Sequence, residues 1–180
     1  MISLNTVIYS ALMLAALGSV PHVTHAEWTV GDAPPGMKGC RLETQEISLF
    51  DGYSDTRVRL SVADGALRVK TESNIDTGFN DLGLVVDGKT FMPADTVADE
   101  KDVLFSSDID AVIDQFIRGN SVTVYLRFWP TYPATQRYEA RFSLAGFTRA
   151  YNDYKACSGK NTSSARLRGR ESSNATDHQV

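Results

Sequence analysis

Residues 56–73, TRVRLSVADGALRVKTES, decide the fold class of this chain. Apolar and polar residues alternate on both sides of Asp64-Gly65. The apolar positions are Val58, Leu60, Val62, Leu67 and Val69. Alternation with a period of two is typical of a strand with one buried face, and Asp-Gly favours a two-residue hairpin turn. The stretch therefore predicts an antiparallel hairpin.

Further strands are predicted by the same signals on either side of this hairpin. Leu82–Val86 turns at Asp87-Gly88 into Thr90–Met92, which makes a second hairpin. The other predicted strands are Cys40–Phe50, Lys101–Phe105, Ser121–Trp129 and Arg137–Leu144. Trp28–Gly39, which is rich in proline and glycine, is predicted to be an irregular lead-in, and Trp129–Pro133 is predicted to be a loop.

Two segments carry helical patterns. In Ser107–Arg118 the apolar residues recur at helical spacing, Ser107 with Asp110 resembles a capping box, and Gly119 is well placed after the last turn. Gly146–Cys157 is predicted to be a closing helix. The sequence thus predicts a mainly β fold with two helices (α+β). It should be an antiparallel, hairpin-rich, β-sandwich-like domain closed by a C-terminal helix.

The two ends of the chain differ from the domain between them. Residues 1–26 are typical of a secretory signal peptide, with an apolar run at Ile8–Val20 and small residues before a cleavage site after Ala26. The alternative is an uncleaved membrane anchor, but the run is shorter than the ~20 residues that a span needs. We expect a single domain at 27–157 and a disordered polar tail at 158–180.

Export affects how the two cysteines are interpreted. Cys40 and Cys157 lie near opposite ends of the predicted domain. A small, even number of cysteines in an oxidising compartment favours a disulfide, with two free thiols as the alternative. We therefore expect a periplasmic or secreted protein with a Cys40–Cys157 disulfide and no membrane span after signal cleavage.

Charge and histidine content argue against several function classes. The net charge is −4 over 180 residues, which is unlike a basic nucleic-acid-binding protein. The histidines are His22, His25 and His178, so residues 27–157 contain none. Catalytic triads and histidine-ligated zinc both require an imidazole. We expect a domain that is not an enzyme and holds no cofactor or metal.

Two motif-like stretches have plainer explanations. Gly83–Thr90 matches the P-loop pattern, but its middle residues read as strand and Pro93 follows where a helix should run. Four acidic residues lie between positions 95 and 102, and their spacing fits no EF-hand. We interpret the first stretch as a hairpin and the second as a solvated acidic surface.

The candidate binding site is a strand face that carries aromatic residues and arginines, together with the loop beside it. Its residues are Tyr125, Arg127, Trp129, Tyr132, Arg137 and Arg141. Aromatic residues and arginine are enriched at protein interfaces. Since Pro130 ends the strand, we expect Trp129 at a sheet margin, where it anchors a partner rather than covering the core. The alternative is that a second sheet or a loop covers this face.

The segment Ser107–Cys157 resembles a known family. Its helix ends Phe116-Ile117-Arg118-Gly119-Asn120, and a later strand leads through Ser143-Leu144-Ala145-Gly146-Phe147 into the last helix. This order is similar to the C-terminal part of the invasion-associated locus B family of exported bacterial proteins. The resemblance covers about the last third of the domain. It implies an exported β-rich domain without known catalysis, sometimes linked to host-cell invasion, and it assigns no functional residues.

Three functions follow as hypotheses. The first is an exported, non-enzymatic bacterial protein that acts by protein–protein interaction, with a virulence or host-interaction role. The alternative is a periplasmic inhibitor or immunity protein against a cell-wall hydrolase or toxin. The third is a hydrolase with paired carboxylates, for which no pair of acidic residues on predicted strands stands out. The expected partner is another protein, not a nucleic acid.

Overall fold

The hairpin predicted at residues 56–73 lies within the larger of two antiparallel sheets. In the computed structural model, β4 (Asp55–Ala63) pairs from Val58 to its end with the whole of β5 (Ala66–Thr71). Asp64 and Gly65 between them have φ angles of 48° and 71°. Two consecutive positive φ angles are the geometry of the turn that matches the twist of paired strands. The structure describes residues 28–33, 39–129 and 136–159.

Five more strands complete the larger sheet. They are β1 (Trp28–Asp32), β2 (Cys40–Thr44), β3 (Ile47–Phe50), β8 (Thr96–Ala98) and β9 (Asp102–Phe105). The strand order is β1-β2-β4-β5-β9-β8, with β3 also paired to β4. Every pairing is antiparallel, as hairpin connections require.

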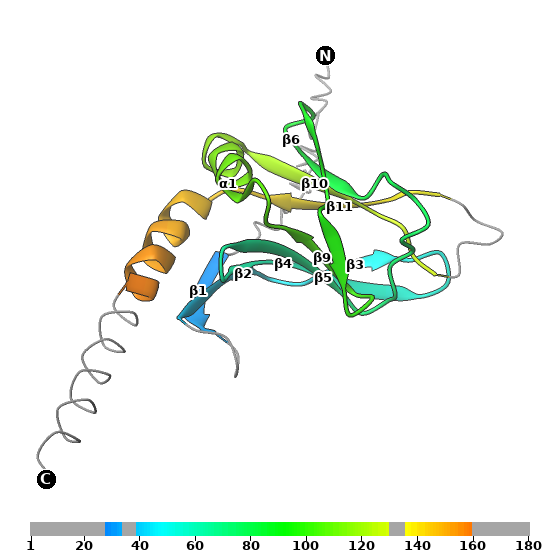
Figure 1. The fold of residues 1–180 in the computed structure, drawn as a ribbon, viewed down its shortest axis with the longest axis horizontal. Helices are drawn as coiled ribbons and strands as arrows, with labels where there is room; N and C mark the ends of the chain where they lie inside the picture. Colours follow the sequence, from blue (N-terminus) through cyan, green and yellow to red (C-terminus); the bar gives the residue numbers. More distant parts are fainter. Residues whose placement is uncertain (1–27, 34–38, 130–135, 160–180) are drawn as a thin grey trace, which may run out of the picture.

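The smaller sheet has four strands and carries most of the candidate site. They are β6 (Gly83–Val86), β7 (Phe91–Pro93), β10 (Ser121–Leu126) and β11 (Tyr138–Ser143). Their order is β11-β10-β6-β7, again all antiparallel. Figure 1 shows this sheet as a layer above the larger one. The segment that matches the P-loop pattern is the β6–β7 hairpin, as predicted.

The core lies between the two sheets and is filled by their alternating apolar residues. The largest fully buried side chains include Leu42, Leu60, Leu67, Leu84, Leu126, Phe105 and Phe128. Helix α1 (Ile109–Arg118) and a C-terminal helix at 147–159 extend this core at one end of the molecule (Figure 1). There the ring of Phe147 lies 4.8 Å from that of Trp28 and 5.2 Å from that of Phe116. The sandwich-like, mainly β fold with two helices is confirmed.

The predicted disulfide is present. Cys40, at the start of β2, is bonded to Cys157 of the C-terminal helix, with their Cα atoms 6.0 Å apart and a sequence separation of 117. It ties the C-terminal helix to β2, next to the edge strand β1. A disulfide is consistent with an oxidising compartment outside the cytoplasm.

Two predictions about the first strands are wrong. The predicted lead-in contains β1, whose Trp28 donates its indole N–H to the carbonyl oxygen of Ser143 across the sandwich. The single strand predicted at Cys40–Phe50 is broken into β2 and β3. Leu42 pairs with Val62 but Ile47 pairs with Val58, so the register shifts by one residue. That shift is a β-bulge, which allows β2 and β3 to pair with successive parts of β4.

The start of α1 also differs from the prediction. Ser107 forms no capping box: the N-cap residue is Asp108, which makes no side-chain cap hydrogen bond. The backbone N–H groups of Ser106 and Ser107 donate instead to Asp95, at the β7–β8 connection. The segment before α1 is therefore anchored by Asp95, which lies twelve positions before Ser107. Gly119 ends it in an extended conformation, with φ −94°.

Several predictions fall outside the described residues. These are the signal peptide at 1–26, the loop at 130–133 with Tyr132, and the tail from residue 160 onward. The last helix continues through Gly159, two residues beyond its predicted end at Cys157. Within the described residues, no helix is long and apolar enough to cross a membrane.

Candidate binding surface

The outward side of the smaller sheet brings together residues that the strand alternation predicted to share a face. Tyr125 of β10 lies between Glu139 of β11 and Gly83 of β6 in the ladder. The guanidinium carbon of Arg137 lies 4.0 Å from the centre of the Tyr125 ring, which is cation–π geometry. The ring of Phe91, from β7, lies 6.2 Å away on the other side of Tyr125. We call this set, with Arg141, the sheet face.

Gly83 explains how Phe91 reaches this position. A Cβ atom added at Gly83 would overlap the Phe91 ring, so the ring lies directly across the glycine backbone. The side chain of Phe91 is 39% exposed even so. Arg141 is exposed and donates to the Glu139 carboxylate at 2.8 Å. The sheet face is thus an aromatic row flanked by arginines, one of them paired.

The opposite outer surface, on the larger sheet, is of a different kind. There Arg57 pairs with Glu72 across the strands at 2.6 Å, and Arg41 pairs with Glu43 of its own strand at 2.9 Å. Exposed ion pairs of this type are typical of a solvated surface and contribute little to stability. The smaller sheet differs in the row of aromatic side chains on its outer face.

Arg127 is held within the domain rather than offered to a partner. Its guanidinium group donates to both carboxylate oxygens of Asp81, at 2.8 and 2.7 Å, and lies 4.0 Å above the ring of Phe79. Only 13% of its side chain is exposed. The hydrogen bonds from Arg127 lower the pKa of Asp81 below its ordinary value, despite some burial. The pair therefore fastens the loop before β6 to the end of β10.

Trp129 faces solvent just beyond this pair. Its side chain is 59% exposed, whereas the preceding Phe128 is 1% exposed and packs in the core. Phe128 forms a bridge with Ile75, and the backbone N–H of Trp129 donates to the carbonyl oxygen of Asn74 at 2.9 Å. The backbone at Trp129 is thus fixed by a neighbouring segment while its indole stays outside the core.

A pocket of about 370 Å³ opens beside this indole. Its lining residues are Asn74, Ile75, Thr77, Val97, Glu100 and Trp129. They come from β8, from the turn after it and from the segment that follows β5, in addition to Trp129 itself. The sequence did not predict this pocket, because its residues are distant in sequence and no local pattern joins them.

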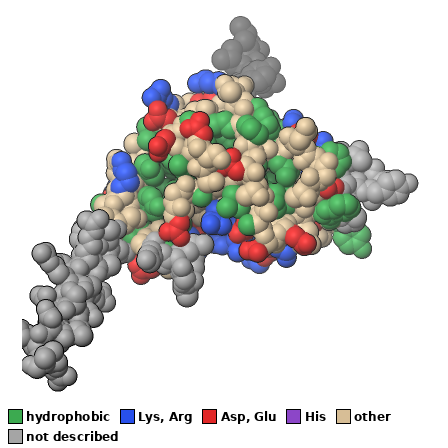
Figure 2. Space-filling model, viewed as in Figure 1, with side chains coloured by type: hydrophobic (Ala, Val, Ile, Leu, Met, Phe, Trp, Pro, Cys, Tyr) green, Lys and Arg blue, Asp and Glu red, His purple; other side chains and the backbone are tan. Residues whose placement is uncertain are grey.

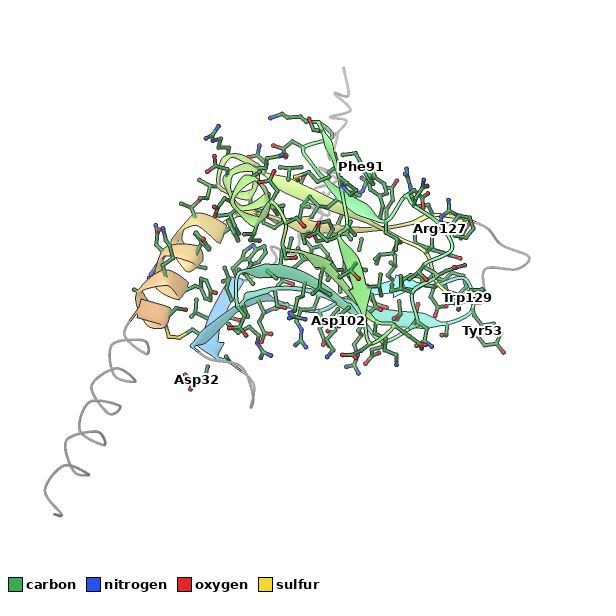
Figure 3. The ribbon with its side chains drawn as sticks, in the orientation of Figure 1. Asp32, Tyr53, Phe91, Asp102, Arg127 and Trp129 are labelled. Carbon is green, nitrogen blue, oxygen red and sulfur yellow. A yellow bond between two sulfur atoms is a disulfide. The ribbon has the colours of Figure 1, made fainter. Side chains whose placement is uncertain are left out.

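Two further aromatic side chains lie at the same end of the molecule. Phe50, the last residue of β3, is 54% exposed, and Tyr53, on the turn between β3 and β4, is 86% exposed. Asp51 holds that turn by accepting hydrogen bonds from the backbone of Ser54 and from the Ser73 hydroxyl at 2.6 Å. Figure 3 places Tyr53, Trp129 and Arg127 at the end opposite the C-terminal helix. We call Phe50, Tyr53, Trp129 and the pocket the Trp129 end.

Hydrophobic and acidic side chains appear together on the surface at this end (Figure 2). Aromatic side chains that are exposed and backed by a rigid scaffold are typical anchors of protein interfaces. Of the predicted site residues, the structure brings Tyr125, Arg137 and Arg141 onto one face and places Trp129 at its margin. Arg127 connects the two, and Tyr132 lies outside the described residues.

Comparisons with protein-family models, with curated proteins and with solved structures find no match to this chain. The resemblance of residues 107–157 to the invasion-associated locus B family therefore stays a prediction. In the part of the chain that the structure describes, no group of three His, Cys, Asp or Glu side chains is arranged to hold a metal ion.

Proposed function

We propose that this chain is an exported bacterial protein, periplasmic or secreted, that binds another protein and catalyses no reaction. The observation that carries the proposal is the exposed indole of Trp129 beside the fully buried Phe128. A tryptophan that the core does not need is costly to leave in water, and partner binding would recover that cost. The Cys40–Cys157 disulfide supports the extracytoplasmic part of the proposal.

The partner docks on the Trp129 end, with the sheet face beside it. Trp129, Tyr53 and Phe50 supply large rigid surfaces that lose little conformational freedom on binding. Their backbone is held by the Asp51 turn and by Asn74, so the surface is largely formed before the partner arrives. Preorganisation of this kind reduces the entropy lost on association.

A capture experiment with matched variants tests the proposal. The full chain, exported and tagged, is used to capture partners from a periplasmic extract as wild type, as Trp129→Ala and as Ile117→Ala. Ile117 is an exposed apolar residue of α1, at the opposite end. We expect Trp129→Ala to fold and to bind its partner roughly 30-fold more weakly, and Ile117→Ala to bind like wild type. A folded Trp129→Ala protein that retains every partner refutes the proposal.

A further inference from the structure

The turn before β9 has an unusual residue at its second position. Among the described residues, three hairpin turns have positive φ at both central residues: Asp64-Gly65, Asp87-Gly88 and Asp99-Glu100. The first two carry glycine second, as this turn type favours. In the third, Glu100 has φ 58°. A residue with a Cβ costs about 1–2 kcal/mol in this left-handed conformation. Such strain, where it persists, points to a functional role.

Glu100 is one of the residues that line the pocket beside Trp129. Its carbonyl oxygen accepts the backbone N–H of Ile75 at 2.7 Å, and its Oε2 accepts the side-chain N–H of Asn74 at 3.1 Å. These two bonds fix both the backbone and the carboxylate on the pocket wall. A single hydrogen bond leaves most of the acceptor capacity of the carboxylate free, because each oxygen has two lone pairs.

Within the described residues, the carboxylate of Glu100 has no basic partner. Asp81 is neutralised by Arg127 and Glu139 by Arg141, but within the described residues no lysine or arginine forms an ion pair with Glu100. The lining residues of the pocket include no lysine or arginine either. The pocket thus presents an unneutralised negative charge next to an exposed indole face.

We infer that this pocket receives a cationic side chain of the partner protein, with arginine preferred over lysine. A cation attracted by Glu100 would lie against the indole of Trp129, which is the strongest aromatic surface for cation–π contact. Ile75 and Val97 supply apolar contacts for the aliphatic stem. A planar guanidinium suits both the ring and the carboxylate. This inference rests on the proposed function, since it assigns the chemistry of the partner at the same surface.

Small probes test the inference without knowledge of the partner. The ¹⁵N-labelled mature chain is titrated with Nα-acetyl-arginine amide and with Nα-acetyl-citrulline amide, its neutral isostere, while the Trp129 indole N–H signal is followed. Trp28 is buried, so its indole signal serves as an internal reference. We expect saturable shifts at Trp129 with the arginine probe and about tenfold weaker binding of the citrulline probe.

Two variants of the same turn show whether arginine binding depends on the carboxylate in the pocket or on the net charge of the chain. Glu100→Gln removes the pocket carboxylate, and Asp99→Asn removes an exposed carboxylate of the same turn that does not line the pocket. Glu100→Gln should weaken arginine binding about tenfold, whereas Asp99→Asn should change it less than about twofold. Thermal unfolding of both variants confirms that they are folded.

Equal affinity for the arginine and citrulline probes would overturn the inference, and so would unchanged arginine affinity in Glu100→Gln. A third contrary result is that Trp129 signals shift with neutral N-acetylglucosamine but not with arginine, because the pocket would then select a neutral ligand. The proposed function fails separately. If arginine does not bind but Trp129→Ala loses its captured partner, the partner-binding function stands and the cation pocket does not. If arginine binds but Trp129→Ala retains every partner, the pocket stands and the proposed function is wrong.

Discussion

At the scale of single residues, Phe128 and Trp129 are neighbours in sequence but should contribute very differently to the free energy of unfolding. Phe128 is fully buried between the sheets, and Trp129 is mostly in solvent. Phe128→Ala should therefore lower the free energy of unfolding by about 3–5 kcal/mol, because it leaves a cavity. Trp129→Ala should lower it by less than about 1 kcal/mol. Urea unfolding of the two variants measures both values. Equal losses would mean that Trp129 belongs to the core.

The strained turn makes a second prediction at this scale. Glu100→Gly should raise the free energy of unfolding by about 1 kcal/mol, because glycine adopts positive φ without a Cβ penalty and the lost hydrogen bond is partly exposed. The same variant should bind arginine poorly. A gain in stability with a loss of binding is the pattern expected of a residue retained for function.

The reverse change at an equivalent turn is the control. Gly65 has φ 71°, and a Cβ atom added there would meet no other atom within 4 Å. Gly65→Glu should therefore cost about 1–2 kcal/mol through backbone strain without a steric clash. Thermal unfolding compares the two variants with wild type. If Glu100→Gly destabilises the fold as much as Gly65→Glu does, the backbone at Glu100 is not strained.

At the scale of elements, α1 depends on a carboxylate from outside the helix. Hydrogen bonds from the backbone N–H groups of Ser106 and Ser107 lower the pKa of Asp95 to about 2. Because this value lies below the ordinary aspartate pKa of about 3.9, the stabilisation is complete above that pH and disappears as pH falls towards 2. Asp95→Asn should be less sensitive to acid in this range. The free energy of unfolding at pH 5 and pH 2.5 measures the difference, and equal acid sensitivity would contradict the assignment.

The end of α1 yields another prediction. Gly119 has an ordinary φ angle, but an added Cβ would overlap the side chain of Val86 and lie 2.9 Å from the carbonyl oxygen of Gln115. Gly119→Ala should thus lower the free energy of unfolding by about 1–3 kcal/mol through overpacking. Gly31→Ala is the control, since nothing lies within 4 Å of a Cβ there. Similar denaturation midpoints for both variants would show that α1 can move away from β6.

The sequence predicts elements well where local signals agree with tertiary structure. Alternation and Asp-Gly turns correctly predicted the β4–β5 and β6–β7 hairpins, and helical spacing predicted α1. The β8–β9 hairpin escaped prediction because β8 has three residues and its turn carries Glu100 instead of glycine. β1 escaped because its pairing with β2 and the burial of Trp28 against distant rings override a proline- and glycine-rich local sequence.

The candidate site was predictable only in part, for the same physical reason. Strand alternation was enough to place Tyr125 and Arg137 on one face. It could not show that Arg127 pairs with Asp81, which lies 46 residues earlier. Nor could it show that Asn74 and Glu100 meet beside Trp129. That contact depends on how the segments after β5, β8 and β10 fold next to one another.

At the scale of the whole molecule, the disulfide should contribute as much stability as the best-buried core side chain. In the chain-entropy model a loop of 117 residues gives about 4–5 kcal/mol, because the bond restricts the unfolded chain. Cys40→Ala/Cys157→Ala should unfold at a correspondingly lower urea concentration. Reductant should lower the midpoint of the wild type to that of the variant. A midpoint that neither treatment changes would mean that the bond adds no stability.

The same bond determines how the protein would respond to a mechanical load. A force applied at the two chain termini first loads β1, which precedes Cys40 and pairs with β2, and then passes through Cys40–Cys157 to the C-terminal helix. The strands between the two cysteines therefore lie outside the load path. About 400 Å of chain contour stays locked while the bond is oxidised, and it becomes extensible on reduction. Tension between the two ends of the chain would thus reach the Trp129 end, which lies between the two cysteines in sequence, only after the sulfur bridge has been cut.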